Sequence, residues 1–286
     1  MTAPFLVGVA LLVAGPALGT AVLATFDWDL IGAPRFVGLG NARDLLEDQV
    51  FRRALANSLS FVAVAVPARL VVASGLAMLL HRPARGAGVA RGAALVPSVM
   101  PDAAYAVLWL WLLNPLFGPV NLVLGAAGLP TPAWLTQPGP SRWAVVIMSL
   151  FVIGDGFLLA LAARRAVPAG LHELAAGQGA TPWAAFRRVT LPIMAPALLL
   201  MVCRDTVASF QATFVPALLV TDGGPPPYAT TYLPLYIYRQ AFEYLRYGKA
   251  AAATLVVLAI TAAAVWLQFR AVDGLRRGGL LARVLD

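Results

Sequence analysis

Five ionisable side chains interrupt apolar stretches of the sequence, and their positions carry the first chemical information. They are Arg69, Asp102, Asp155, Arg204 and Asp205. A charged side chain at the centre of a lipid-exposed helix costs about 2.5–3.5 kcal/mol. We therefore expect these groups to face a bundle interior, a water-filled path, or one another. A carboxylate on such a path could accept hydrogen bonds from the hydroxyl groups of a polar solute.

The residues near these charges supply further candidates for a solute path. The rings of Trp109, Trp111 and Phe210 could stack on the face of a sugar ring. The alternative is structural, because Arg69 or Arg204 could pair with an aspartate only to hold two helices together. The candidate path residues are Asp102, Trp109, Asn114, Asp155, Arg204, Asp205, Phe210 and Gln211.

Helix-disrupting residues lie beside three of the charges. Pro67 precedes Arg69, Pro101 precedes Asp102, and glycines flank Asp155 on both sides. Proline removes a backbone donor, and glycine weakens a helix. The sequence therefore predicts bends or unwound turns at these three places.

The sequence shows no catalytic constellation. A phosphate-binding loop needs a glycine-rich turn that ends in lysine followed by serine or threonine, whereas Lys249 follows Gly248 and precedes Ala250. The two histidines, at 81 and 172, have no ligand spacing around them, and the single cysteine excludes an internal disulfide. We expect no metal site, no cofactor and no enzymatic activity in this chain.

Composition places the chain in a membrane. Hydrophobic residues make up 60% of the 286 positions and charged residues only 12%, against about 25% in soluble domains. A soluble protein of this length could not bury so much apolar surface. The net charge of +8 comes from arginines in short loops, which argues against a nucleic-acid-binding groove.

Six apolar runs are long enough to cross a bilayer, which requires roughly 20 residues. They lack the alternation of strands, so an all-α integral membrane fold is predicted. The first run has no positively charged segment before it, which favours a retained span over a cleaved signal peptide. The predicted spans cover residues 3–25, 57–80, 92–113, 143–163, 192–220 and 248–269.

Arginine density predicts the orientation of these spans. Residues 81–91, 164–191 and 270–286 hold three, four and four arginines and are assigned to the cytoplasm. The connector 26–56 holds four arginines and five acids, which suits the outer side. Both termini are then cytoplasmic. The predicted organisation is a first span and extracytoplasmic connector (1–52), a core of the second to sixth spans with the loop 164–191 (53–270), and a cytoplasmic tail (271–286).

The segment between the fourth and fifth spans, residues 171–192, predicts a compact helix–turn–helix on the membrane surface. Thr181 can cap a helix that begins at Pro182. Gly177 and Gly179 allow a bend before it. Trp183 and Phe186 share an apolar face with Val189, and two arginines are expected in the last turn, at 187 and 188.

This segment resembles the coupling loop of binding-protein-dependent ABC importer permeases. The family pattern, EAA, three residues, glycine, nine residues, then LP, is met at Glu173, Ala175, Ala176, Gly179 and Leu191-Pro192. The sequence departs from it at Leu174, where alanine is usual, and at Gln178, where the sugar-importing branch has aspartate. Residues 35–46, 51–61, 101–121, 209–225 and 236–252 resemble that branch too, so the resemblance covers nearly the whole chain.

The resemblance implies the type I ABC importer permease fold, with six transmembrane helices, and a role as one permease subunit that moves a carbohydrate or related polyol by alternating access. Its implied partners are a second related permease, two ATPase subunits carrying ATP and Mg²⁺, an extracytoplasmic solute-binding protein and the lipid of a bacterial inner membrane. A proton-coupled secondary transporter and an integral membrane enzyme are the alternatives. The implied ATPase-coupling residues are Glu173, Ala176, Gly179, Trp183, Phe186, Leu191 and Pro192.

Overall fold

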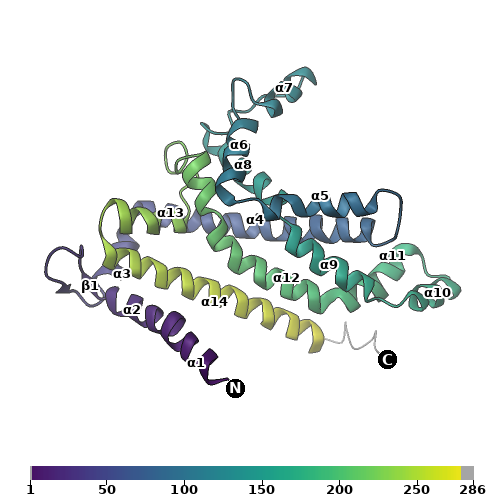
Figure 1. The fold of residues 1–286 in the computed structure, drawn as a ribbon, viewed down its shortest axis with the longest axis horizontal. Coiled ribbons are helices and arrows are strands. Elements are labelled where there is room, and N and C mark those ends of the chain that lie inside the picture. Colours follow the sequence, from purple (N-terminus) through teal and green to yellow (C-terminus); the bar gives the residue numbers. More distant parts are fainter. Residues whose placement is uncertain (1, 278–286) are drawn as a thin grey trace.

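Helices form most of the chain in the computed structural model, which describes residues 2–277 (Figure 1). The first half contains α1 (Ala3–Val9), the π-helical turn η1 (Ala10–Ala14), α2 (Gly15–Leu23), α3 (Gly40–Glu47), α4 (Gln49–Leu80), α5 (Ala87–Val99), α6 (Asp102–Leu112) and α7 (Pro119–Ala126). The second half contains α8 (Pro138–Phe151), α9 (Gly154–Arg165), α10 (Ala169–Gly177), α11 (Pro182–Ala185), η2 (Phe186–Thr190), α12 (Leu191–Ala212), η3 (Pro216–Val220), α13 (Leu233–Tyr238), η4 (Arg239–Glu243) and α14 (Tyr247–Arg277).

Four of the apolar segments are long, continuous helices: Ala3–Leu23, Gln49–Leu80, Pro182–Val220 and Tyr247–Ala271. Two further segments are pairs of helices bent at a break, by 103° between α5 and α6 and by 47° between α8 and α9. The described chain thus has four candidate spans, or six if each bent pair crosses once. An antiparallel hairpin of β1 (Phe26–Asp27) and β2 (Arg35–Phe36) lies between the first two spans.

The breaks occur where the sequence predicts them in two of three cases. Met100 has an extended backbone, as expected of a residue before proline, and α6 starts afresh after Pro101. At the other break a Cβ on Gly154 would overlap Ser98, and the Gly154 N–H donates to the Ser98 hydroxyl at 2.8 Å. At Pro67 the helix does not unwind, because α4 continues through this residue.

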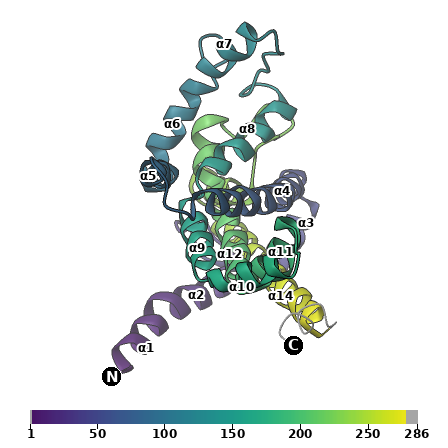
Figure 2. The same ribbon diagram turned by 90° about the vertical axis from the view of Figure 1, so that its right-hand side faces the viewer.

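The predicted third span is not one straight helix. α5 has 13 residues, so it rises only about 20 Å before the chain turns aside. Figure 2 shows α6 and α7 projecting away from the bundle formed by the long helices. Asp102 therefore lies in the first turn of α6, where it is exposed, and not in the middle of a span.

Small side chains let the central helices pack closely. Ala73 and Ala77 of α4 are fully buried against Phe157 and Ala160 of α9 and Met201 of α12. Alanine at a helix contact lets the two backbones approach, which is the main source of attraction between helices in lipid. This packing places the charged residues of α9 and α12 beside each other.

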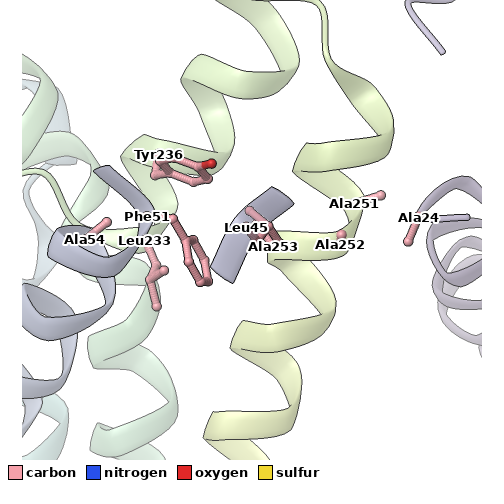
Figure 3. Close-up of a cluster of buried hydrophobic side chains, with 9 residues drawn as sticks. All are labelled: Ala24, Leu45, Phe51, Ala54, Leu233, Tyr236, Ala251, Ala252 and Ala253. Carbon is pink, nitrogen blue, oxygen red and sulfur yellow. The ribbon is translucent and has the colours of Figure 1, made fainter. Parts of the chain in front are cut away.

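A second cluster closes the opposite end of the bundle (Figure 3). Phe51 of α4 and Leu233 and Tyr236 of α13 pack with Leu45 of α3, and three consecutive alanines of α14, residues 251–253, leave room for them. The Asn41 amide donates to the carbonyls of Ala24 and Phe26, at 2.9 and 2.8 Å, which ties α3 to the end of the first span.

The segments that arginine density assigns to opposite sides of the membrane lie at opposite ends of the molecule. The hairpin, α3 and α13 lie at one end, and α10, α11 and the α4–α5 loop lie at the other (Figure 1). The first residues of α1 and the end of α14 point toward the second end. α14 runs to Arg277, so the predicted tail 271–286 starts inside a helix, and its residues 278–286 lie outside the described part of the chain.

Candidate functional site

The helix–turn–helix at 169–190 begins with α10, and a Schellman motif ends that helix. The N–H of Ala180 donates to the carbonyl of Ala175, and the N–H of Gly179 donates to that of Ala176, both at 2.9 Å. Gly179 adopts a φ of +77°, as this motif requires of its C′ residue. The three-residue spacing between Ala176 and Gly179 therefore places the glycine at the position where it caps the C-terminus of α10.

Gly179 is needed for its backbone conformation and not for space. Nothing lies within 4 Å of a Cβ built at this position. An L-residue in the left-handed region is strained by roughly 1–2 kcal/mol, and β-branched residues are rare there. The bend that the sequence attributes to two glycines is made by Gly179 alone, because Gly177 is the last residue of α10.

The second helix starts as predicted but does not end before the fifth span. The Thr181 hydroxyl accepts from the N–H of Ala184 at 3.2 Å, and Pro182 opens α11. The helix then continues through η2 into α12, where the Leu191 N–H bonds to the Phe186 carbonyl five residues back. This wider turn leaves room for the ring of Pro192. The expectation of a separate helix that ends near Arg188 is therefore wrong.

The surface of this unit combines exposed apolar side chains with one acidic and two basic groups. Trp183 is 69% exposed and stacks on the half-buried Phe186, with ring centroids 5.4 Å apart. Leu174 is also exposed, and Glu173 and Ala176 are exposed on α10. Leu191 and Pro192 lie further along the helix, toward the membrane, and Arg187 and Arg188 are exposed beside Trp183. We call residues 169–190 the coupling unit.

A contact that sequence reasoning missed joins the two helices of the coupling unit. His172 Nε2 lies 3.0 Å from the hydroxyl oxygen of Thr190, which is buried. This hydrogen bond connects α10 to η2 across the turn. The available signal was weak: a threonine immediately before the Leu-Pro pair, 18 residues from the histidine.

Two ion pairs involve the charges within the spans, and they differ in environment. Arg69 of α4 lies 3.1 Å from Asp205 of α12, donates to the Ser209 hydroxyl, and packs over the ring of Phe61. Arg69 is only 5% exposed. This pair is part of the bundle interior and supports the structural interpretation of these two residues.

The second pair lies on the outside of the bundle of this single chain. Arg204 of α12 donates to the carboxylate of Asp155 of α9, and their side chains are 57% and 64% exposed. Leu200, Arg204, Val207 and Gln211 are exposed at spacings of four, three and four along α12, so they share one face. Because lipid disfavours exposed charges at mid-span, this face belongs against water or another protein chain.

The remaining path candidates are not gathered at this face. Trp109 is buried against Phe151, with ring centroids 5.3 Å apart, and Phe210 is buried as well, so neither ring is open for stacking. The Asn114 side chain accepts from the N–H groups of Leu116 and Phe117, which makes it a turn residue beyond α6. The structure thus pairs Asp155 with Arg204, places Gln211 two turns further along the same face of α12, and leaves Asp102 and Asn114 elsewhere. Among the described residues, no group of three or more His, Cys, Asp or Glu side chains could hold a metal ion.

Comparison with known proteins places this architecture in a family. The profile of the family described as "Binding-protein-dependent transport system inner membrane component" matches residues 52–277. The chain is 28% identical over 271 residues to the probable ABC transporter permease protein YesP of Bacillus subtilis (strain 168), covering 93% of this chain and 87% of that protein. It is 30% identical over 263 residues to the sn-glycerol-3-phosphate transport system permease protein UgpA of Yersinia pestis, covering 91% and 87%.

Further relatives agree with these. Identity is 27% over 276 residues to the sulfoquinovosyl glycerol transport system permease protein SmoG of Agrobacterium fabrum, covering 94% of this chain and 88% of that protein. The fold matches a chain of a bacterial alginate ABC transporter, solved with an alginate pentasaccharide-bound periplasmic protein, with a TM-score of 0.80 at 22% identity over 94% of this chain and 91% of that one. The chain therefore belongs to the binding-protein-dependent transport system inner membrane components, and it is a multi-pass permease subunit of an ABC transporter and not an enzyme.

Proposed function

We propose that this permease moves a carbohydrate or related polyol into a bacterial cell across the inner membrane, driven by ATPase subunits that dock on the coupling unit. The solute class is supported by the relatives, whose names refer to sn-glycerol-3-phosphate and sulfoquinovosyl glycerol. By the same kinship we infer two ATPase subunits carrying ATP and Mg²⁺, a second related permease chain and an extracytoplasmic solute-binding protein.

The observation that carries the proposal is the continuity of the coupling unit with α12. Trp183, an exposed apolar anchor suited to a groove on another protein, begins the same unbroken helical segment that bears Arg204. The two residues are 21 positions apart, roughly 32 Å along a helix. A displacement of the docked ATPase is therefore transmitted to the exposed ion pair without an intervening flexible joint.

The ion pair is the part of the path that such a movement would change. Arg204 and Asp155 lie on different helices, so tilting α12 against α9 separates the guanidinium from the carboxylate. Separated, both groups can exchange hydrogen bonds with solute hydroxyls, since a guanidinium donates and a carboxylate accepts. When Arg204 and Asp155 pair again, their hydrogen-bonding groups are no longer available to the solute. Opening and closing of this ion pair would thus accompany the alternating-access movement of the permease.

The first span supports the presence of a second permease chain. In Ala3–Leu23, no residue of the apolar window is buried in this chain, and the main contact of α2 with the bundle is along α14. A helix so exposed within its own chain has surface available to a neighbouring subunit, as well as to lipid. The predicted orientation, with the coupling unit and both termini in the cytoplasm, places that unit where ATP is available.

The proposal is tested with the complete transporter in proteoliposomes, by measuring ATPase stimulation by the solute-loaded binding protein. Trp183→Ala should reduce that stimulation at least several-fold, because the anchor of the docking surface is lost. Trp143→Ala, which removes a similarly exposed tryptophan from α8, is the matched control. Equal stimulation in wild type and Trp183→Ala, with the complex intact, would exclude docking at this surface. Uptake that collapses with proton uncouplers but persists with an inactive ATPase would instead identify a secondary transporter.

A further inference from the structure

Cationic side chains converge where α4 and α9 end beside the coupling unit. Leu80 of α4 and Leu161 of α9 pack in one apolar cluster, so the residues that follow them come together. Arg164 is one turn beyond Leu161, and His81 and Arg82 directly follow Leu80. Figure 1 shows the α4–α5 loop and the end of α9 at the end of the molecule that holds α10.

Arg91 of α5 folds back onto the same place. Its Nε donates to the carbonyl of Leu80 at 2.9 Å, and a terminal nitrogen donates to that of Arg82 at 3.0 Å. Burial lowers the pKa of His81, and the nearby charges of Arg164, Arg82 and His172 lower it further, against a hydrogen bond to the Met78 carbonyl that raises it. We call His81, Arg82, Arg91 and Arg164 the basic cluster.

The described side chains provide no counter-charge for the basic cluster. None of its members is within ion-pair distance of a described carboxylate, and the Arg164 Nε is buried without a hydrogen-bond partner. Glu173 is the only acid in residues 81–91 and 164–191, and it is exposed. A partly buried guanidinium without a partner is costly, so the arrangement calls for an anion from outside this chain.

The surroundings of the basic cluster indicate which kind of anion would bind there. Leu79, in the last turn of α4, is 78% exposed, and Val89, in the first turn of α5, is 80% exposed. Cations next to exposed aliphatic side chains at the end of a membrane span form the pattern that suits a phosphate headgroup with its acyl chains.

We propose that the basic cluster binds the phosphate headgroup of an anionic phospholipid from the cytoplasmic leaflet, with acyl chains along Leu79 and Val89. The arginines hold the phosphate oxygens as charge-assisted hydrogen-bond donors. Because the site joins the ends of α4 and α9 at the base of the coupling unit, the bound lipid braces the helices through which the ATPases act.

The test measures phosphatidylglycerol bound to the purified complete transporter by native mass spectrometry and by the shift in thermal unfolding. Arg82→Gln with Arg164→Gln should weaken binding about thirtyfold, which corresponds to about 1 kcal/mol for each arginine. The control, Arg52→Gln with Arg53→Gln, removes the same charge from two exposed arginines at the other end of α4 and should bind as wild type does. If the double variant folds poorly, Arg82→Gln alone, at an exposed position, replaces it in the test and should show a partial loss of phosphatidylglycerol binding.

Three results would overturn the proposal. One is equal phosphatidylglycerol binding by the double variant and wild type. The second is full stabilisation by millimolar inorganic phosphate in phosphatidylcholine vesicles, which would identify a free-anion site. The third is loss of the ATPase subunits from the double variant in phosphatidylcholine and phosphatidylglycerol vesicles alike, which would show that an acidic group of the ATPase fills the basic cluster.

Discussion

The ammonium nitrogen of Lys249 lies 2.7 Å from Oδ2 of Asp48, although the two residues are 201 positions apart. The Tyr236 hydroxyl donates to the same oxygen at 2.8 Å, and Oδ1 accepts from the N–H groups of Val50 and Phe51. One carboxylate thus caps α4 and joins it to α13 and α14. The only lysine of the chain, which lacks the context of a nucleotide-binding loop, is half of a structural ion pair.

Unfolding at low pH should depend on Asp48. Burial raises the pKa of this carboxyl, but hydrogen bonds from Lys249, Tyr236 and the Phe51 N–H outweigh burial and leave it lowered. A lowered folded-state pKa stabilises the protein above the unfolded value of about 3.9, and that contribution is lost as pH falls through the folded-state pKa. At neutral pH, Asp48→Asn keeps the cap through its amide oxygen, but its NH2 group cannot accept the hydrogen bonds of Lys249 and Tyr236, so the variant should destabilise the fold by roughly 2–4 kcal/mol.

The measurement is the thermal unfolding midpoint of the purified transporter as a function of pH. Asp48→Asn should flatten the acid limb of that curve, whereas Asn at the exposed Asp44 should leave it unchanged. An unaltered acid limb in Asp48→Asn would contradict the structural role of this ion pair.

Gly248→Ala should loosen the connector from the bundle. A Cβ at this position would overlap the Phe26 carbonyl oxygen and crowd the Asn41 amide, so the first turn of α14 must shift. Overpacking of this kind costs roughly 1–3 kcal/mol. Gly75→Ala within α4, where nothing lies within 4 Å of the new methyl group, is the control and should be neutral or slightly stabilising. Proteolysis of the 26–48 connector and the unfolding midpoint report the difference, and equal behaviour of the two variants would refute the close contact.

Substitutions at Gly179 should follow backbone preference and not side-chain volume. The position has a φ of +77° and open space around it, so Gly179→Asn should stay close to wild type in ATPase stimulation by the loaded binding protein. Gly179→Val should strain the turn by about 1–2 kcal/mol or unwind it, and stimulation should fall while the spans stay folded. Similar losses in both variants would indicate that a partner contacts the glycine directly.

The two ion pairs within the spans should respond differently to removal of one partner. Arg69→Ala leaves Asp205 buried without a cation, which should cost about 3–5 kcal/mol and reduce assembly. Asp155→Asn removes a charge from an exposed pair, so assembly should persist while transport rates change. Size-exclusion yield and uptake in proteoliposomes separate the two effects. A normal yield for Arg69→Ala would argue against the structural role of that pair, and unchanged uptake by Asp155→Asn would remove it from the path.

Local features of the coupling unit could be predicted from the sequence because they depend on neighbouring residues. A threonine before a proline starts α11, and a glycine three residues after an alanine pair ends α10 in a Schellman motif. Four of the six apolar runs likewise correspond to long continuous helices, since hydrophobicity is a local property of the sequence. The predicted end of the second helix of the coupling unit, before Pro192, is wrong. A π-helical turn just before Pro192 accommodates its ring, so the helix continues into α12.

The sequence by itself determined the four long apolar helices, the charges at 69, 155, 204 and 205 that interrupt apolar segments, and where the coupling unit begins. Only the tertiary structure decided that Arg69 pairs with Asp205 and Arg204 with Asp155, and that the first pair is buried and the second exposed. Adjacent positions, 204 and 205, have opposite environments because successive residues of a helix point about 100° apart. Which side meets α4 and which meets α9 depends on the close packing of alanines from helices far apart in the chain, and no local pattern encodes that choice.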